Sequence, residues 1–213
     1  DSQQSWLKTT KFSANAGQFT FLPDQNGDMG SAVVVVCKTP LWDIAKAARD
    51  LPAGSWHPDF TFAADIAVSD IQLGWGLAQY KFAPHKTTDT DNALPELALC
   101  DTALCIDSSA LVLGTHIVRE MVNLPANQMT PAGIEQAARE IAQACSAHFS
   151  VVSGEALERY APALHTVGRA AEIGPRMIQL LWGDGGPVIT LVGKGISFDS
   201  GGLDIKPSKA MEI

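Results

Sequence analysis

The chain has 213 residues, 46% of them hydrophobic, and carries a formal net charge of -8. This length suffices for one large or two small domains, each with a core of its own. The hydrophobic fraction is high enough to fill such cores, which argues against disorder. Because the chain has no cationic excess to neutralise phosphates, nucleic acid and anionic membrane surfaces are not expected as partners. No apolar run approaches the roughly 18 residues that a membrane span requires.

The four cysteines lie in apolar surroundings and lack the paired spacing of a metal or redox motif. The chain also begins without the apolar segment of a signal peptide. We therefore expect a cytoplasmic protein with reduced, buried thiols. These cysteines are Cys37, Cys100, Cys105 and Cys145.

The first third of the chain begins with a strand pattern followed by a helix pattern. Ser31–Cys37 includes four consecutive valines, which predict a buried strand, and Trp42–Leu51 has apolar residues at helical spacing before Pro52. Together they predict a βα unit. Phe60–Val68 fits either a strand or the approach to a helix, whereas Pro84–Leu94 has no apolar periodicity and is expected to be an exposed loop.

Two further elements complete the N-terminal part of the chain. Ile71–Tyr80 is predicted to be a helix, although Gly74 and Gly76 each weaken it. A short strand is expected around Leu97–Cys100.

Two helices are predicted in the middle of the chain. The first begins at Asp107 or Ser108, either of which can cap it, and ends before Pro125. The second is long and begins at Thr130 and Pro131, which form a clear N-cap and first-turn pair.

The remaining elements alternate and predict an α/β layer with a mixed, mostly parallel sheet, with a hairpin across the glycine-rich turn at 183–186. They are expected at Phe149–Val152 (strand), Gly154–Tyr160 (helix), His165–Val167, Met177–Trp182 and Val188–Val192 (strands). The charges of Arg139 and Glu140 are interpreted as a solvated helix face. We place an N-terminal α/β domain at 1–107 and a second α/β domain at 108–213.

Leu191–Lys206 joins an apolar run to a loop with four glycines, two lysines and two aspartates. Lys194, Asp199 and Lys206 stand out, because lysine and carboxylate on glycine-rich backbone suit a metal site or acyl transfer. A surface ion pair between Lys194 and Asp199 is the structural alternative. The apolar run predicts that Lys194 follows the C-terminal end of a strand, where open α/β sheets bind ligands, and this favours a functional site.

Other motifs of nucleotide binding and catalysis fail. A P-loop is excluded because Val188 stands where its first glycine belongs and Gly195 follows Lys194. The GxSxG elbow is absent around Ser200, which leaves a serine hydrolase as a weaker alternative. The five histidines occur singly, without the HExxH spacing of zinc peptidases. Arg169 remains a candidate because it follows a predicted strand.

Residues 192–207 read Val-Gly-Lys-Gly-Ile-Ser-Phe-Asp-Ser-Gly-Gly-Leu-Asp-Ile-Lys-Pro. This segment resembles the metal-binding loop of the leucyl (cytosol) aminopeptidases, the M17 metallopeptidases. Val122–Asn127, with the Thr-Pro pair that follows it, is similar to that family's entry into its catalytic domain, and His165–Ala170 resembles a further family segment. The resemblance covers the chain from Arg119 onward.

The resemblance implies a catalytic α/β domain behind an N-terminal α/β domain, a homo-hexamer, and peptide substrates with a free, leucine-like N-terminus. It implies that Lys194 and Asp199 ligate two divalent metal ions, Mn²⁺ or Zn²⁺. It further implies that Lys206 is the catalytic lysine that contacts the substrate carbonyl. Two adjacent cations can bind the substrate amine, polarise the carbonyl and activate water.

The resemblance also implies a third carboxylate ligand after the Met211 region, then an Asp and Glu pair and an arginine further on. None of these is present up to Ile213. We therefore expect the chain to be part of a longer enzyme and to be inactive alone. The alternative from another class is a non-catalytic binding protein or a DNA-binding regulator related to this family, which the acidic composition does not favour.

Overall fold

The computed structural model describes residues 2–59, 66–83, 93–99 and 105–211, which form two compact units, Asp1–Glu120 and Met121–Ile213. Predictions for residues 60–65, 84–92 and 100 lie outside the described residues. None of the described helices combines the length and the apolar character that a membrane crossing requires.

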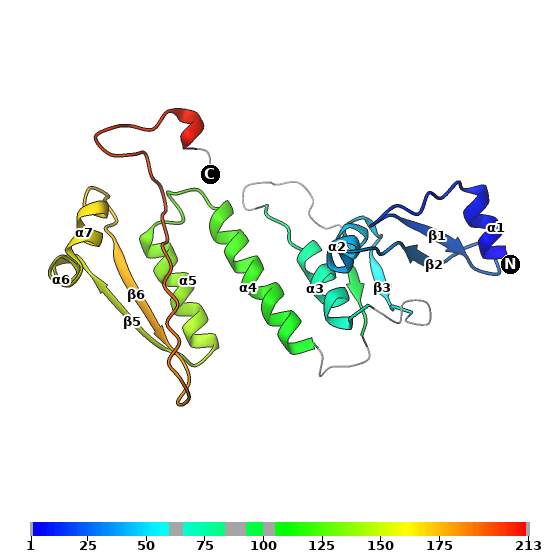
Figure 1. Ribbon diagram of the computed structural model, residues 1–213, viewed down its shortest axis with the longest axis horizontal. Coiled ribbons are helices and arrows are strands. Elements are labelled where there is room, and N and C mark those ends of the chain that lie inside the picture. Colours follow the sequence, from blue (N-terminus) through cyan, green and yellow to red (C-terminus); the bar gives the residue numbers. More distant parts are fainter. Residues whose placement is uncertain (1, 60–65, 84–92, 100–104, 212–213) are drawn as a thin grey trace. The chain divides into compact units, whose positions relative to one another are not determined.

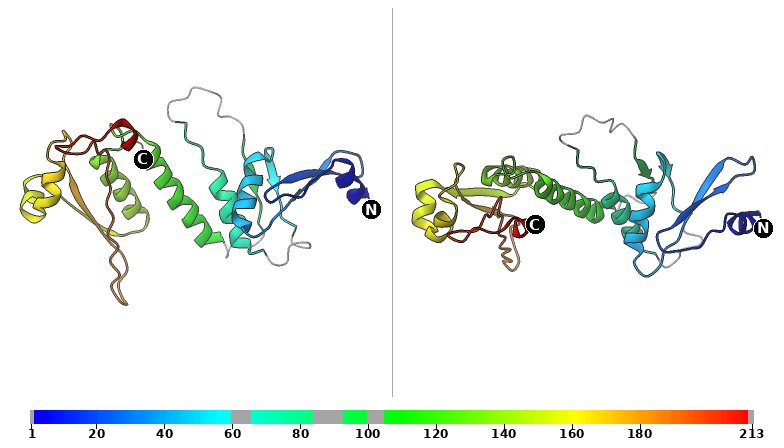
Figure 2. Two further views of the ribbon diagram at one scale, coloured as in Figure 1. Left: turned by 45° about the horizontal axis from the view of Figure 1, so that its top comes forward. Right: turned by 90° about the horizontal axis from the view of Figure 1, so that it is seen from above.

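The first unit opens with helix α1 (Ser2–Thr9) beside a hairpin of β1 (Phe19–Pro23) and β2 (Met29–Val34), as Figures 1 and 2 show. The two strands are antiparallel, with Phe19 opposite Val34. The valine run is thus a half-buried hairpin strand that begins at Met29, and the prediction of a buried strand is wrong. A hairpin of two strands is covered by other elements on one face at most, so its valines are only partly buried.

Both predicted helices of the first unit are confirmed, as α2 (Pro40–Asp50) and α3 (Val68–Ala78). They pack together around a buried apolar cluster. Its buried members are Ile44, Ala48, Leu51, Ile71 and Trp75. A short parallel pair, β3 (Gly54–Trp56) and β4 (Pro95–Leu97), lies against this core, since the indole Nε1 of Trp75 donates to the carbonyl of Pro95 at 3.1 Å.

Gly74 and Gly76 lower the helix propensity of α3 but allow neighbouring helices to pack closely against it. A Cβ at Gly74 would collide with the main chain of Leu41 on α2, and a Cβ at Gly76 would lie 2.5 Å from a methyl of Val112. Val112 belongs to α4 (Cys105–Asn123), which begins two residues before the predicted Asp107. Close helix approach therefore outweighs the propensity cost of glycine.

The second unit combines α5 (Pro131–Ala144) with an antiparallel pair, β5 (His148–Ser153) and β6 (Arg176–Leu181). As predicted, Thr130 caps α5, because its hydroxyl accepts a hydrogen bond from the Gly133 amide at 3.3 Å. The chain between β5 and β6 forms α6 (Gly154–Tyr160), with the predicted bounds, and α7 (Pro162–Gly168), which lie at one end of the strand pair (Figure 1). A 3₁₀ turn, η2 (Ser208–Ala210), follows the candidate loop.

The α/β class of the fold is confirmed, but two predicted strands of the second unit are wrong. His165–Val167 lies in α7, because Pro162 opens a helix that continues through it. Val188–Val192 is extended chain, and Val188 and Val192 are each 93% exposed. A strand requires a neighbour to bond with, and within the described ranges this run has none. The mostly parallel sheet is therefore not formed by the described residues.

The structure also bears on the predictions for the cysteines and for the domain boundary. Cys37 and Cys145 are free thiols, as expected, but both are exposed, so their predicted burial is wrong. The predicted domain boundary between residues 107 and 108 falls within α4 and stays a prediction.

Because a methyl at Gly74 would meet the main chain of Leu41, Gly74→Ala is expected to lower the free energy of unfolding by about 1–3 kcal/mol through overpacking. The control is Gly114→Ala, on exposed α4 surface with nothing within 4 Å of the added methyl. That change should stabilise by about 0.5–1 kcal/mol through helix propensity. Urea unfolding of both variants measures the difference, and equal effects would contradict the packing role of Gly74.

Candidate functional site

The candidate loop brings Asp199 and Lys206 into direct contact. The ammonium Nζ of Lys206 lies 2.8 Å from Oδ2 of Asp199, and the other oxygen, Oδ1, accepts the Gly201 amide at 2.9 Å. Both charged side chains are only about one-third exposed, at 33% for Lys206 and 38% for Asp199. Both oxygens of the carboxylate are thus occupied, one by a charged donor and one by the backbone.

The backbone of the loop closes on itself and so produces this contact. The amide of Lys206 donates to the carbonyl of Ser200 at 2.9 Å, and Gly201 and Ile205 form an antiparallel bridge. Gly201 has a φ of +102°, and a Cβ at this position would collide with the carbonyl of Asp204. Only glycine fits this turn without strain, because its φ is positive and it carries no side chain.

The environment of Asp199 favours its ionised form. The hydrogen bond from Lys206 lowers the pKa of this carboxyl below its ordinary value of 3.8, and the Gly201 amide lowers it further. The charges of Lys206 and of Lys194 act in the same direction. The loop therefore presents an anionic oxygen donor in a cationic setting.

Lys194 does not make the surface ion pair that the structural alternative proposes. In the described part of the chain, Lys206 is the lysine that pairs with Asp199. Lys194 is exposed and influences Asp199 only through its charge. It follows an extended run that pairs with no strand among the described residues, so its predicted place at the end of a strand is wrong.

The donor set suits a cation but is incomplete. Asp199 already holds a cationic group, and the hydroxyl oxygen of Ser197, between the two proposed ligands, is buried without a hydrogen-bond partner among the described residues. No group of three or more His, Cys, Asp or Glu that could hold a metal occurs within the described ranges. Asp199 can thus supply one donor of a metal site, and the role of Lys194 as a second ligand stays a prediction.

Arg169 lies at the C-terminal end of α7 and is exposed. It makes no hydrogen bond or ion pair with the candidate loop in the part of the chain that the structure describes. The structure gives Arg169 no role at this site.

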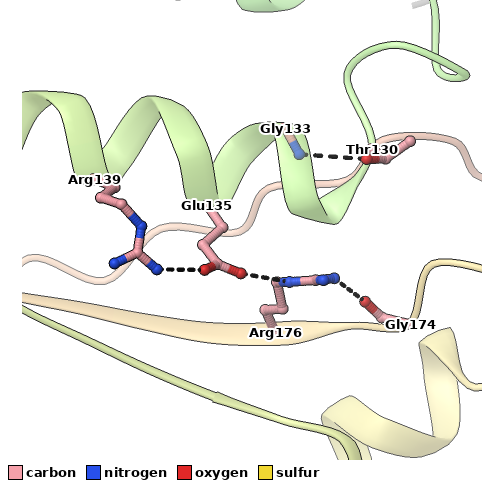
Figure 3. Close-up of polar contacts among 6 residues, drawn as sticks. All are labelled: Thr130, Gly133, Glu135, Arg139, Gly174 and Arg176. Atoms are coloured by element: carbon pink, nitrogen blue, oxygen red, sulfur yellow. Dashed lines mark hydrogen bonds and ion pairs between the residues drawn. The ribbon is translucent and has the colours of Figure 1, made fainter.

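Sequence reasoning missed a charge network that attaches α5 to β6 (Figure 3). Glu135 accepts from Arg139 at 2.7 Å on its own helix and from Arg176 on β6 at 2.6 Å. Arg139 also lies over the ring of Phe149, 4.4 Å from its centroid, while its side chain is 41% exposed, so its predicted solvated face is solvated only in part. The spacing of Glu135 and Arg139 was the available signal.

The network holds Glu135 in its ionised form. Hydrogen bonds from Arg139 and then from Arg176 lower the pKa of Glu135 below its ordinary value of 4.5. Glu135 and Arg176 are about one-fifth exposed. Their attraction is therefore less screened by water than that of a surface pair.

Comparison with known proteins finds family models that match both parts of the chain. Residues 1–99 match the family model described as M17 aminopeptidase, N-terminal domain, and residues 116–213 match that of the cytosol aminopeptidase family, catalytic domain. The chain is 33% identical to a probable cytosol aminopeptidase of Geobacter sp. over 78% of its own length and 37% of that protein.

Solved structures agree with this match. A cytosol aminopeptidase from Coxiella burnetii superposes with a TM-score of 0.88 at 30% identity, over 98% of this chain and 46% of that one. The bottromycin maturation enzyme BotP, solved in complex with Mn, shares the fold with a TM-score of 0.83 at 24% identity, over 98% of this chain and 49% of its own. The chain belongs to the M17 cytosol aminopeptidase family and spans less than half the length of these relatives.

Gly201→Ala is expected to open the turn and to raise the pKa of Asp199 back toward 3.8, because both of its hydrogen-bond donors depend on loop closure. Gly202→Ala is the control, since nothing lies within 4 Å of its added methyl. Carboxyl-carbon NMR titration of both variants measures the shift. A pKa of Asp199 that stays low in Gly201→Ala would refute the role of the turn.

Glu135→Gln is expected to lower the free energy of unfolding at neutral pH by about 1–3 kcal/mol. The folded pKa of Glu135 is depressed, so its contribution is fully present above the unfolded value of 4.5 and is lost as pH falls through the folded pKa. The difference between the unsubstituted protein and the variant should therefore shrink below pH 4.5. Chemical unfolding at stepped pH tests this, with the exposed Glu140→Gln on the same helix as control; a difference independent of pH would contradict it.

Proposed function

We propose that the protein is a metal-dependent aminopeptidase that hydrolyses the first peptide bond of peptides with a free, leucine-like N-terminus. The observation that carries this proposal is the contact between Lys206 and Asp199 in a loop that belongs to an M17 catalytic domain. A charged lysine beside a carboxylate with lowered pKa provides a cationic donor and an anionic ligand at one place.

Lys194 and Asp199 are the residues that would hold metal, Asp199 through its carboxylate and Lys194 as a neutral amine. Two divalent ions, Mn²⁺ or Zn²⁺, when bound supply polarisation of a carbonyl and activation of water near neutral pH. Manganese is supported by BotP, which was solved in complex with Mn. The other ligands are expected from residues outside this loop, in keeping with the incomplete donor set.

Lys206 is proposed as the catalytic lysine. Its backbone is fixed by the hydrogen bond from its own amide to the carbonyl of Ser200, and its ammonium lies 2.8 Å from Asp199. In its charged form it can donate a hydrogen bond to the substrate carbonyl oxygen and stabilise the negative charge that develops there.

The wider setting is proposed from the relatives. Their name, cytosol aminopeptidase, supports a cytoplasmic location. The family resemblance supports a homo-hexamer, with residues 1–107 as the N-terminal domain and 108–213 as part of the catalytic domain. Because the chain spans less than half of these relatives, the proposed activity is that of the whole protein.

Lys206→Met is expected to lower kcat for leucine p-nitroanilide by about 10²- to 10³-fold in the Mn²⁺-loaded whole protein, because the donor to the developing charge is lost. Lys209→Met, an exposed lysine in the adjacent turn, is the control and should retain activity. Metal content is measured in parallel. Hydrolysis that needs no metal, or an unchanged kcat in Lys206→Met, would refute the proposal.

A further inference from the structure

Lys194 stands on a segment that is held by few neighbours. After β6 the chain turns back and runs past α5 as an extended ribbon before the candidate loop (Figure 1). Leu191 is 92% and Val192 is 93% exposed, and no strand among the described residues pairs with this ribbon. Some contact other than sheet bonding must therefore fix the backbone at Lys194 if its amine is to be held in place.

The glycines on either side of Lys194 differ in their surroundings. A Cβ at Gly193 would meet nothing within 4 Å. A Cβ at Gly195 would lie 3.3 Å from Cδ1 and 3.9 Å from Cγ2 of Ile134. The side chain of Ile134 thus lies on the side of Gly195 where a Cβ would stand, beside the backbone next to Lys194.

Ile134 is itself firmly placed. It lies in the first turn of α5, where its amide donates to the carbonyl of Thr130 at 3.0 Å. The next residue, Glu135, makes the 2.6 Å ion pair with Arg176 of β6 (Figure 3). Ile134 thus lies between the capped start of α5 and a residue that is paired with β6.

We propose that Ile134 is a positioning residue, which holds the backbone at Gly195 and thereby sets where the Lys194 amine stands. The role in metal binding rests on the proposed function of Lys194, whereas the contact itself does not. Residues that support a metal ligand from behind commonly govern metal affinity, because they decide how much of the ligand's freedom is lost on binding.

The two contact distances define a matched set of variants. Ile134→Val removes Cδ1, the atom 3.3 Å from the Gly195 position, and keeps Cγ2 at an ordinary contact distance of 3.9 Å. Gly195→Ala adds a methyl that would press on Cδ1 of Ile134, and Ile134→Val removes that contact. Gly193→Ala adds the same methyl to the same segment in open space.

The first experiment needs no metal. Trypsin cleaves after Lys194 faster when this segment is looser, and cleavage after Lys209 serves as the internal reference. We expect Ile134→Ala to speed cleavage after Lys194 several-fold relative to Lys209, as measured by mass spectrometry of the metal-free chain. An unchanged ratio in a variant whose circular dichroism matches that of the unsubstituted chain would overturn the proposal.

The second experiment titrates Mn²⁺ into the metal-free whole protein by calorimetry. Gly195→Ala is expected to weaken binding about tenfold, Gly193→Ala to leave it unchanged, and Ile134→Val to restore affinity in the Gly195→Ala background. Equal losses in the two glycine variants, or no restoration by Ile134→Val, would overturn the proposal. If the unsubstituted protein binds no Mn²⁺, the proposed function fails, and the tryptic ratio alone decides the role of Ile134.

Discussion

The second unit depends on one carboxylate shared by two guanidinium groups. Glu135 accepts from Arg139 within α5 and from Arg176 at the start of β6, so a single side chain joins helix to strand. Without it, two like charges would face each other with part of their solvation lost. Helix α5 also carries Ile134, so the ion pair lies one residue from the side chain that we propose as the support of the extended chain after β6.

The candidate loop, by contrast, is organised by bonds within itself. The Gly201 turn, the bond from Lys206 to Ser200 and the carboxylate of Asp199 all belong to one short stretch. Short-range closure costs little chain entropy, so this half of a site can form without the long-range pairing that the preceding run lacks. The contact between Asp199 and Lys206 therefore does not depend on what packs against the extended run Val188–Val192.

The same distinction explains what could be predicted from the sequence. The Thr130 cap and the bounds of α6 were predictable because capping and helix propensity act between near neighbours. Val188–Val192 has the composition of a strand, but pairing depends on distant residues, and none among those described supplies it. His165–Val167 failed because β-branched residues favour a strand, whereas Pro162 starts a helix upstream of them.

At the candidate site, residue types predict which side chains matter, whereas their contacts depend on the backbone geometry. Composition singled out Lys194, Asp199 and Lys206, but it could not say which lysine meets the carboxylate, because that choice depends on the positive φ of Gly201. Of the two partners of Asp199, the Gly201 amide is fixed by the turn, whereas the ammonium of Lys206 stands on a flexible side chain with four rotatable bonds. A metal ion bound at Asp199, as proposed, would therefore compete with the ammonium of Lys206 for this carboxylate and leave the Gly201 turn intact.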